Sequence, residues 1–297
     1  MKGLFKKESL EALEFEYAQS DRAIIIHEDC LKVLDELKET SVDLIIADPP
    51  YNLRKDFGNK SDSWEDKKAY LKWCYNWIDA CFRVLKDNGT FYLMNSTQNI
   101  PYLSIYLQEN YHIICDIVWT YDSSGMQSKK KFGSLYEPIL MACKNSKAKY
   151  TFNHEAILVE TKTGAQRGVI DYRKNPPRLY NTMKIPGNVW NFSRVRYKMA
   201  EYENHPSQKP EALLERMIKA SSNIDEVVLD PFGGTFSTCA VASRLGRKTI
   251  GMDINLEYYK IGIRRTGITE TYHGEHLQKD RSRKTQHLSK KDHLNAK

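Results

Sequence analysis

Two short apolar runs of this sequence, far apart along the chain, each end in the dipeptide Asp-Pro. The run VDLIIA (42–47) is followed by DPPY (48–51), and the run EVVLD (226–230) is followed by PFGGT (231–235). A continuous β-branched run is typical of a central parallel strand that is covered on both faces. The two runs therefore predict buried strands, and the turns that follow them are the first places to look for function.

Strand-like and helix-like segments alternate on both sides of a polar middle region. The expected strands are 23–27, 42–47, 90–95, 113–119, 138–143, 226–230 and 249–253, and the expected helices include 31–37, 67–85, 211–222, 237–246 and 255–265. Asn88-Gly89 is expected to close the second of these helices. This alternation predicts the α/β class, with a doubly wound, mostly parallel sheet.

Changes in composition divide the chain into five segments. They are an exposed helical or frayed N-terminal extension (1–20), a first α/β half (21–143), a middle region rich in Lys, Arg, Asn, Tyr and Pro (144–204), a second α/β half (205–268) and a basic tail expected to be mobile (269–297). The middle region has no long helical period and is expected to be an insertion into one domain.

Overall composition excludes several classes of protein. The 297 residues carry a formal charge of +7, which fits a polyanionic partner without requiring one. The 6 cysteines are scattered, with no Cys-x-x-Cys pair and no cluster of histidines, so we expect no metal site and a reducing compartment. We also expect no signal peptide and no membrane span, because the N-terminal segment is charged and no apolar run approaches about 18 residues.

The turn PFGGT (231–235) offers a binding site for a nucleotide-like ligand. It follows a strand that ends in Asp230 and precedes a helix expected to begin near Phe236, so backbone N–H groups point at the carboxyl edge of the sheet. Such a turn could equally be structural. Asp253 closes the next strand, however, where an acid can accept hydrogen bonds from ribose hydroxyls. No Gly-x-Gly-x-x-Gly or Walker lysine is present, and an acid suits a cationic ligand such as S-adenosylmethionine.

The turn DPPY (48–51) is open to a structural and a chemical interpretation. Proline and aspartate commonly end strands, which makes a simple turn plausible. Chemically, a carboxylate and a backbone carbonyl could each accept one N–H of an exocyclic amine and direct its lone pair at a methyl group. Proline stiffens the turn and keeps its carbonyl, and the tyrosine ring could stack on a base flipped out of a duplex.

DPPY and DPFGGT together resemble the amino-methyltransferases that act on adenine N6, or less often cytosine N4, in DNA. The order, with DPPY first and the cofactor half last, resembles their β class. Further segments resemble the same family: HPSQKP (205–210), GSLYEPIL (133–140), WTYDSSG (119–125), IDYRKNPP (170–177) and PGNVW (186–190). The likeness runs from about residue 23 to 266 and includes stretches shared with solitary adenine methyltransferases of bacteria.

The resemblance implies a role for each matching residue. Asp48 and the Pro49 carbonyl would accept from the adenine amine, with Pro50 completing the turn and Tyr51 stacking on the flipped base. Asp253 would bind the ribose of S-adenosylmethionine, Asp29 would contact its adenine, and Lys209 is a candidate for its carboxylate. The full set implied to bind the cofactor is Asp29, His205, Gln208, Lys209, Asp230, Pro231, Phe232, Gly233, Gly234, Thr235 and Asp253. Pro206 and Pro210 would line the same pocket.

Two positions depart from the pattern of the family. Phe236 stands where a small residue is usual, which puts the packing of the cofactor loop in doubt. Asp253 stands where glutamate is commoner, which shortens the reach to the ribose. No metal is needed for the implied chemistry, because a direct in-line displacement gains its rate from positioning and electrostatics.

The middle region (144–204) is the candidate for target recognition, because basic residues alternate there with aromatics. The residues expected to bind double-stranded DNA, in or near this region, are Lys129, Lys130, Lys131, Arg173, Lys174, Arg194 and Arg196. Each of them taken singly could also belong to a solvated loop.

Other functions remain open at this point. Cytosine-N4 methylation is disfavoured, because such enzymes usually have serine in place of Asp48. An inactive DNA-binding relative, or an enzyme that methylates an amine of RNA or protein, is a further alternative. The expected location is the cytoplasm of a bacterium, for a bacterial or phage-encoded protein, and the resemblance leaves a homodimer open.

Overall fold

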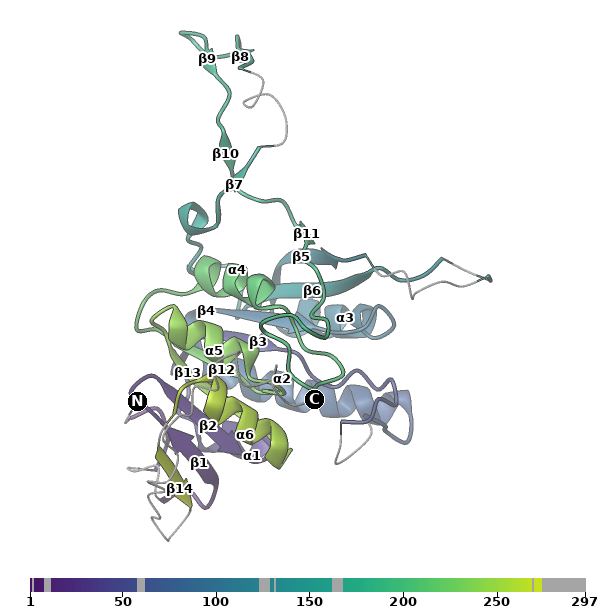
Figure 1. Ribbon diagram of the computed structural model, residues 1–297, viewed down its shortest axis with the longest axis vertical. Coiled ribbons are helices and arrows are strands. Elements are labelled where there is room, and N and C mark those ends of the chain that lie inside the picture. Colours follow the sequence, from purple (N-terminus) through teal and green to yellow (C-terminus); the bar gives the residue numbers. More distant parts are fainter. Residues whose placement is uncertain are drawn as a thin grey trace, which may run out of the picture.

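The computed structural model describes residues 1, 3–7, 12–57, 62–122, 129–130, 132–161, 168–268 and 270–273. Ten of the described strands form one sheet (Figure 1). In spatial order they are β11 (Val189–Asn191), β5 (His112–Thr120), β6 (Tyr136–Cys143), β4 (Leu85–Met94), β3 (Val42–Ala47), β12 (Val227–Asp230), β13 (Lys248–Asp253), β2 (Ala23–His27), β1 (Glu16–Gln19) and β14 (Glu270–His273).

The five central strands, β4-β3-β12-β13-β2, run parallel, and antiparallel pairs occur toward both edges. Strands β3 and β12 come from opposite ends of the chain and pair directly, Leu44 with Val228 and Ile45 with Leu229. Every residue of β3 and of β12 is buried. The prediction of a doubly wound, mostly parallel α/β sheet is confirmed.

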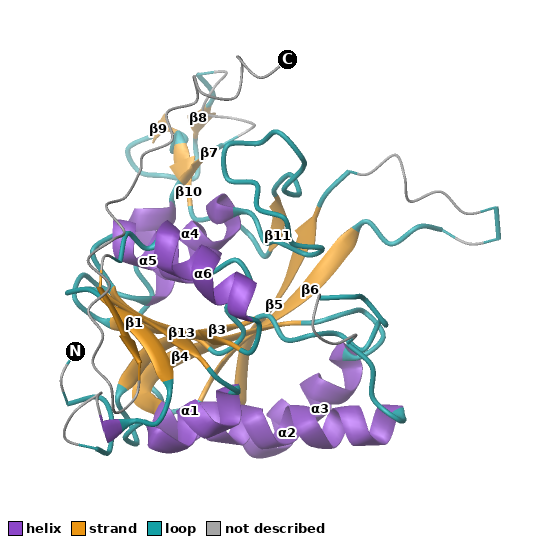
Figure 2. Ribbon diagram, turned by 60° about the horizontal axis from the view of Figure 1, so that its bottom comes forward, coloured by secondary structure: helices purple, strands orange, loops and turns teal. Residues whose placement is uncertain are grey.

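Helices cover both faces of this sheet (Figure 2). One face carries α1 (Cys30–Glu36), α2 (Lys67–Val84) and α3 (Ile100–Asn110), and the other carries α4 (Glu211–Ser221), α5 (Ser237–Arg244) and α6 (Leu256–Arg265). Each helix turns an apolar side to the sheet, as Trp77 and Ile78 of α2 and Met217 of α4 do. Burial on both faces is the reason that the central strands are uniformly apolar. No helix of the described residues is long and apolar enough to span a membrane.

The N-terminal segment is not the exposed extension that its charged sequence suggested. Strand β1 pairs with both β2 and β14, and Phe5 and Leu13 are buried. The expected mobile tail is likewise wrong for residues 270–273, which form β14, whereas residues 269 and 274–297 lie outside the described residues. Both strands are added at the sheet edge by backbone hydrogen bonds, which leave little apolar pattern in a sequence.

The end of α2 is also corrected. The helix ends at Val84, and Asn88-Gly89 lies inside β4 instead of closing the helix. Leu85 already pairs with Val42 of β3, so the chain enters the sheet at once. A Cβ on Gly89 would lie 2.6 Å from the Leu85 side chain and 3.0 Å from the Asp43 carbonyl oxygen. The glycine therefore allows close approach between strands and is no helix terminator.

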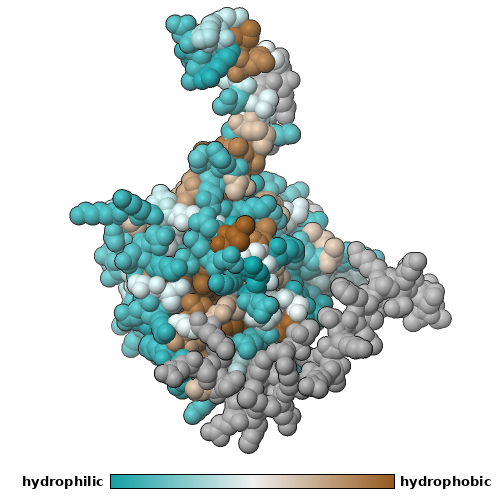
Figure 3. All heavy atoms as spheres, turned by 90° about the vertical axis from the view of Figure 1, so that its left-hand side faces the viewer, coloured by the Kyte–Doolittle hydropathy of each residue, from teal (hydrophilic) through white to brown (hydrophobic). Residues whose placement is uncertain are grey.

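The middle region is only partly separate from the sheet. Strand β11 extends the sheet beside β5, and the short helix η2 (His154–Ile157) packs against α4. Between them the chain projects away from the body as an arm, with strand pairs β7 (Val159–Glu160) with β10 (Met183–Lys184) and β8 (Ile170–Asp171) with β9 (Arg178–Leu179) (Figure 1). Apolar side chains, among them the exposed Ile170 and Leu179, gather on this arm (Figure 3). The proposed domain boundaries at residues 144 and 204 stay a prediction.

Candidate active site

Four acidic residues meet at the carboxyl edge of the central strands. Asp48 follows β3, Asp230 ends β12, Asp253 ends β13, and Asp29 lies just after β2. These four strands are neighbours in the sheet, in the order β3-β12-β13-β2, so their ends open into one cavity of about 410 Å³. A crevice at the carboxyl ends of parallel strands is where open α/β sheets bind ligands.

This cavity brings together residues from both halves of the chain. All eleven residues expected to bind the cofactor line it: Asp29, His205, Gln208, Lys209, Asp230, Pro231, Phe232, Gly233, Gly234, Thr235 and Asp253. Asp48, Pro49 and Pro50 form part of the same wall, while Tyr51 lies behind them. Other lining residues that the sequence had not indicated include Glu28, Phe57, Asn255 and Tyr258. The cavity volume falls within the usual range of about 300–1,000 Å³ for small-molecule sites.

The cofactor loop is held by the two acids beside it. The Gly234 N–H donates to Asp253 Oδ2 at 2.8 Å, and the Phe232 N–H donates to Asp230 Oδ1 at 3.1 Å. Gly234 has a φ of 50°, and a Cβ there would lie 3.1 Å from the His205 ring. Burial raises the pKa of Asp230 to about 7 and that of Asp253 to about 6. Each acid would gain from a ligand that brings positive charge or hydroxyl donors.

Phe236, the departure noted in the sequence, is accommodated by three glycines. Its backbone has a left-handed φ of 53°, and its side chain is fully buried. A Cβ would meet the Phe236 ring at 2.5 Å from Gly233, 2.9 Å from Gly251 and 2.6 Å from Gly262. The large ring therefore occupies space that three neighbouring residues leave empty, and the loop keeps its turn and its helix start.

The DPPY turn carries a compact group of charged and hydroxyl side chains. The Tyr51 hydroxyl donates to Asp48 Oδ1 at 2.5 Å, and the Lys209 ammonium lies 2.7 Å from Asp48 Oδ2. Glu137 of β6 completes the group, with its Oε2 3.3 Å from the Tyr51 hydroxyl and 3.5 Å from the Lys209 ammonium. Burial raises the pKa of Tyr51 well above its usual value, and the neighbouring Asp48 and Glu137 add to the effect. Tyr51 is therefore a neutral hydrogen-bond donor at this site.

The backbone of the turn is fixed by residues that sequence reasoning missed. The Asp62 carboxylate accepts from the N–H groups of Tyr51 and Leu53, at 3.2 and 3.0 Å. On the other side, the Tyr70 hydroxyl donates to the Pro50 carbonyl at 2.9 Å, and Asn99 donates to the Tyr51 carbonyl at 2.8 Å. These polar residues come from a loop, from α2 and from the residue just before α3, so no local pattern connects them with DPPY.

The segment HPSQKP closes the cavity from the α4 side. The His205 ring lies beside Gly234, and burial, with help from Lys209 and Lys55, lowers its pKa to about 3, which keeps it neutral. Lys209 does not point freely at the cofactor cavity in this structure, because its ammonium is paired with Asp48. The side-chain amide of Gln208 makes two hydrogen bonds to the backbone. It donates to the Glu201 carbonyl at 2.6 Å and accepts from the Glu203 N–H at 2.8 Å.

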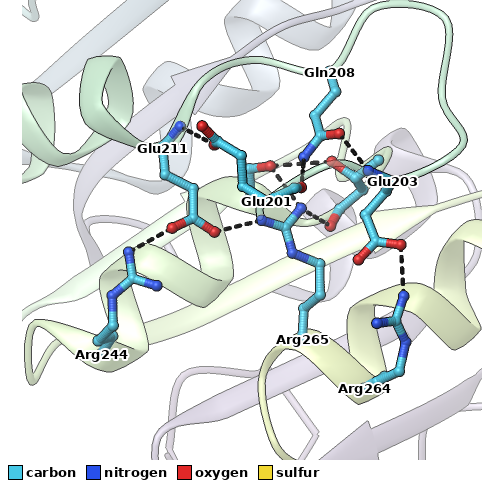
Figure 4. Close-up of polar contacts among 9 residues, drawn as sticks. Glu201, Glu203, Gln208, Glu211, Arg244, Arg264 and Arg265 are labelled. Atoms are coloured by element: carbon cyan, nitrogen blue, oxygen red, sulfur yellow. Dashed lines mark hydrogen bonds and ion pairs between the residues drawn. The ribbon is translucent and has the colours of Figure 1, made fainter. Parts of the chain in front are cut away.

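A network of acids and arginines continues from Gln208 to α6 (Figure 4). Glu211 pairs with Arg244 at 2.7 Å and with Arg265 at 2.6 Å. Arg265 also donates to the Thr235 carbonyl at 2.9 Å and to the Ser237 hydroxyl at 2.8 Å, which ties α6 to the cofactor loop. The next residue, Arg264, pairs with Glu203 at 2.6 Å nearer the surface.

The basic residues expected to bind DNA lie in several places. Arg173 and Lys174 belong to the arm, where Arg173 pairs with Asp171 at 2.8 Å. Lys129 and Lys130 are exposed in the connection between β5 and β6, and Lys131 lies outside the described residues.

The two remaining arginines, Arg194 and Arg196, follow β11 and lie nearer the DPPY turn. The Arg194 guanidinium lies 4.9 Å from the centre of the Tyr121 ring, and Arg196 donates to the Asp122 carbonyl at 2.9 Å. Within the described part of the chain, no group of three or more His, Cys, Asp or Glu residues is placed to hold a metal ion.

The sequence is similar to those of known DNA methyltransferases. A family model described as "DNA methylase" matches residues 42–264. The DNA adenine methyltransferase YhdJ of Escherichia coli K12 is 54% identical over 270 residues, which cover 91% of each chain. The type II methyltransferase M.HpaI of Haemophilus parainfluenzae is 40% identical over 244 residues, or 81% of this chain and 73% of that protein.

Solved structures resemble the whole arrangement of strands and helices. The structure of M1.HpyAVI with SAM superposes with a TM-score of 0.53 at 25% identity, over 81% of this chain and 98% of that one. The cytosine-N4-specific PvuII DNA methyltransferase gives a TM-score of 0.64 at 19% identity, over 83% and 87% of the two chains, and shows the shared fold. The chain belongs to the DNA methylase family.

Proposed function

We propose that this protein is a sequence-specific DNA methyltransferase that transfers a methyl group from S-adenosylmethionine to the N6 amine of adenine. The observation that carries this proposal is the position of Asp48. Its carboxylate stands in the wall of the cofactor-sized cavity, on a turn whose backbone is held on both sides. A carboxylate so placed can accept an N–H of an exocyclic amine beside a methyl donor.

The residues around the cavity fit S-adenosylmethionine. Buried acids suit its positive charge and its ribose hydroxyls, and we assign Asp230 and the Gly233-Gly234 turn to the methionine end and Asp253 to the ribose. Asp29 caps α1 through the Leu31 N–H at 2.9 Å and is assigned to the adenine end of the cavity. The cofactor supplies a methyl group on a positively charged sulfur, which leaves as a neutral thioether.

The protein's own residues orient the target base. The Tyr70 hydroxyl already holds the Pro50 carbonyl, so we assign the Pro49 carbonyl and the Asp48 carboxylate to the two N–H groups of the adenine amine. With both hydrogens held, the nitrogen lone pair is directed toward the methyl group. Tyr51 provides an aromatic face for a base that has left the duplex. Asp48 is also the nearest acceptor for the proton that the nitrogen must lose.

Double-stranded DNA is the proposed partner, bound by the arm and by the basic residues named above. Each lysine or arginine that neutralises a phosphate makes the slope of log affinity against log salt more negative by about 0.9. Substituting Arg173 and Lys174 together by alanine should therefore make the slope less steep, while Lys219→Ala on α4 should leave it unchanged. The proposed location is a bacterial cytoplasm and the proposed assembly is a homodimer. Light scattering of the purified protein measures its oligomeric state.

The direct test is incubation of the protein with unmethylated genomic DNA and S-adenosylmethionine labelled in its methyl group. We expect label in N6-methyladenine, and sequencing of modified bases maps the recognition site. Label in N4-methylcytosine, or none in DNA while RNA is labelled, would overturn the assignment.

A further inference from the structure

The Lys209 ammonium already occupies the place assigned to the target amine. It lies 2.7 Å from Asp48 Oδ2 and 5.2 Å from the centre of the Tyr51 ring. It is therefore in contact with the carboxylate that should receive the adenine amine and near the ring that should face the base. The lysine side chain is 6% exposed, which makes this an internal group rather than a surface lysine that happens to reach the site.

Both oxygens of the Asp48 carboxylate are engaged in this state. Tyr51 donates to Oδ1 at 2.5 Å and Lys209 donates to Oδ2. A carboxylate oxygen can accept a second hydrogen bond, but the Lys209 ammonium lies over the Tyr51 ring and against Asp48 Oδ2, where the amine of a base stacked on Tyr51 would also lie, so one donor has to move. The backbone of Tyr51 is anchored by Asp62 and Asn99, and its ring is 9% exposed, so its hydroxyl has little room to move. Lys209 has a flexible stem and three donors, so it is the group that can move.

Glu137 is the second carboxylate within reach of Lys209, whose ammonium also donates to the Ser207 carbonyl at 3.4 Å. The Glu137 Oε2 lies 3.5 Å from the ammonium, an ion pair that a small shift would shorten. A buried ammonium left without a partner would be strongly unfavourable, but here it would stay between two carboxylates throughout. Burial acts to lower the pKa of Lys209, yet Asp48 and Glu137 outweigh it and raise the pKa above its ordinary value, so the group remains charged.

We propose that Lys209 is a resident cation that fills the target-amine position of the empty enzyme and moves to Glu137 when the adenine amine binds Asp48. Glu137 is then a positioning residue, which acts through Lys209. The inference rests on the proposed function. The displacement of Lys209 would make the enzyme select bases that carry an amine. A base that lacks an N–H donor gives Asp48 no hydrogen bond in place of the one from the lysine.

The first test compares single-turnover methyl transfer on a duplex that carries the mapped recognition site. Glu137→Gln keeps an acceptor for Tyr51 but removes the charge that receives Lys209, so we expect transfer to fall about 100-fold. S-adenosylmethionine affinity and melting temperature should change little. The double variant Glu137→Gln/Lys209→Met also lacks the ammonium that blocks Asp48. We expect its rate of methyl transfer to be at least about tenfold higher than that of Glu137→Gln. Glu215→Gln, an acid of the α4 surface, is the control.

The second test replaces the target adenine by purine, which lacks the 6-amino group. We expect wild-type protein to bind the adenine duplex more tightly than the purine duplex, and Glu137→Gln to bind both equally. The inference is overturned if Glu137→Gln transfers methyl at the wild-type rate, if the double variant is no faster than Glu137→Gln, or if the preference for adenine survives. Failure of the proposed function is distinguishable, because then wild-type protein would produce no N6-methyladenine at all.

Discussion

The Arg265 guanidinium donates a hydrogen bond of 2.9 Å to the carbonyl oxygen of Thr235, and so connects α6 to the cofactor loop. The same side chain pairs with Glu211 at the start of α4 and is 8% exposed. Arg264, its neighbour in sequence, is 61% exposed and reaches only Glu203. Two adjacent arginines of one helix thus serve different purposes, and they form a matched pair for experiment.

Arg265→Ala should weaken S-adenosylmethionine binding at least about tenfold, because charge-assisted hydrogen bonds to buried partners contribute about 1.5–3 kcal/mol. Arg264→Ala removes an exposed ion pair and should cost less than about 1 kcal/mol of stability, with no loss of cofactor affinity. Isothermal titration calorimetry measures the affinities. Arg265→Lys keeps the charge but lacks the planar guanidinium group, so its affinity for S-adenosylmethionine should lie between those of the two alanine variants. Equal cofactor affinities for the two alanine variants would contradict this role of Arg265.

Asp48→Ala should abolish methyl transfer while leaving cofactor binding intact. The carboxylate is assigned to the amine of the base, whereas the acids Asp230 and Asp253 are assigned to the cofactor, so the two functions should separate. Single-turnover transfer and cofactor titration on the same preparation test this. Loss of both activities together in a variant that melts like wild type would refute the assigned roles.

Cofactor binding should depend on pH through Asp230. Burial raises its pKa to about 7, so the empty protein carries a largely neutral Asp230 below that pH. A ligand with positive charge binds the ionised form better, so S-adenosylmethionine affinity should rise as pH increases toward and past 7, then level off. S-adenosylhomocysteine, which lacks the charge on sulfur, should show a shallower rise.

Titrations with both ligands between pH 5.5 and 8.5 make the comparison. Burial raises the pKa of Asp253 to about 6, and because Asp253 is assigned to the ribose, which both ligands share, its contribution should cancel in the ratio of the two affinities. A ratio that is independent of pH would exclude Asp230 as the partner of the charged end.

Gly262→Ala should destabilise the protein by about 1–3 kcal/mol, the usual cost of overpacking a filled core. The new Cβ would lie 2.6 Å from the Phe236 ring, which is fully buried and has no room to withdraw. In a Phe236→Leu background the smaller side chain should accept the added methyl group, and the cost of Gly262→Ala should shrink. Urea denaturation of the four proteins gives this coupling energy directly. If the effects of the two substitutions on the free energy of unfolding are additive, contact with the Phe236 ring is not the reason that residue 262 must be glycine.

Sequence periodicity predicted the central part of the fold well. The run 42–47 is a buried strand, residues 227–230 of the run 226–230 form another, and the helices that follow β12 and β13 lie where the spacing placed them. The sequence-based prediction is wrong where strand pairing, and not the pattern of apolar side chains, determines the structure. Strands β1 and β14 are each four residues long and are placed by antiparallel pairing with their neighbours, and Gly89 lies in β4, where β3 passes close by.

The sequence by itself determined the chemistry that the site can offer. It specified which acids follow which strands, that both turns contain proline, and that the DPPY half precedes the cofactor half. These properties are local, since they depend on residue type and on neighbours along the chain. The membership in the DNA methylase family, expected from those motifs, is confirmed by the family model and by the relatives.

Only the tertiary structure decided what surrounds Asp48. Sheet order places β3 beside β12 and β6 near the DPPY turn, and this brings Lys209 and Glu137 into contact with one carboxylate. Arg265 reaches the cofactor loop for the same reason, because α6 packs against α5. Contacts between residues so distant in sequence depend on how the elements pack, and no local pattern records them. The DPPY turn thus supplies the Asp48 carboxylate, while the fold determines that the Lys209 ammonium lies against it.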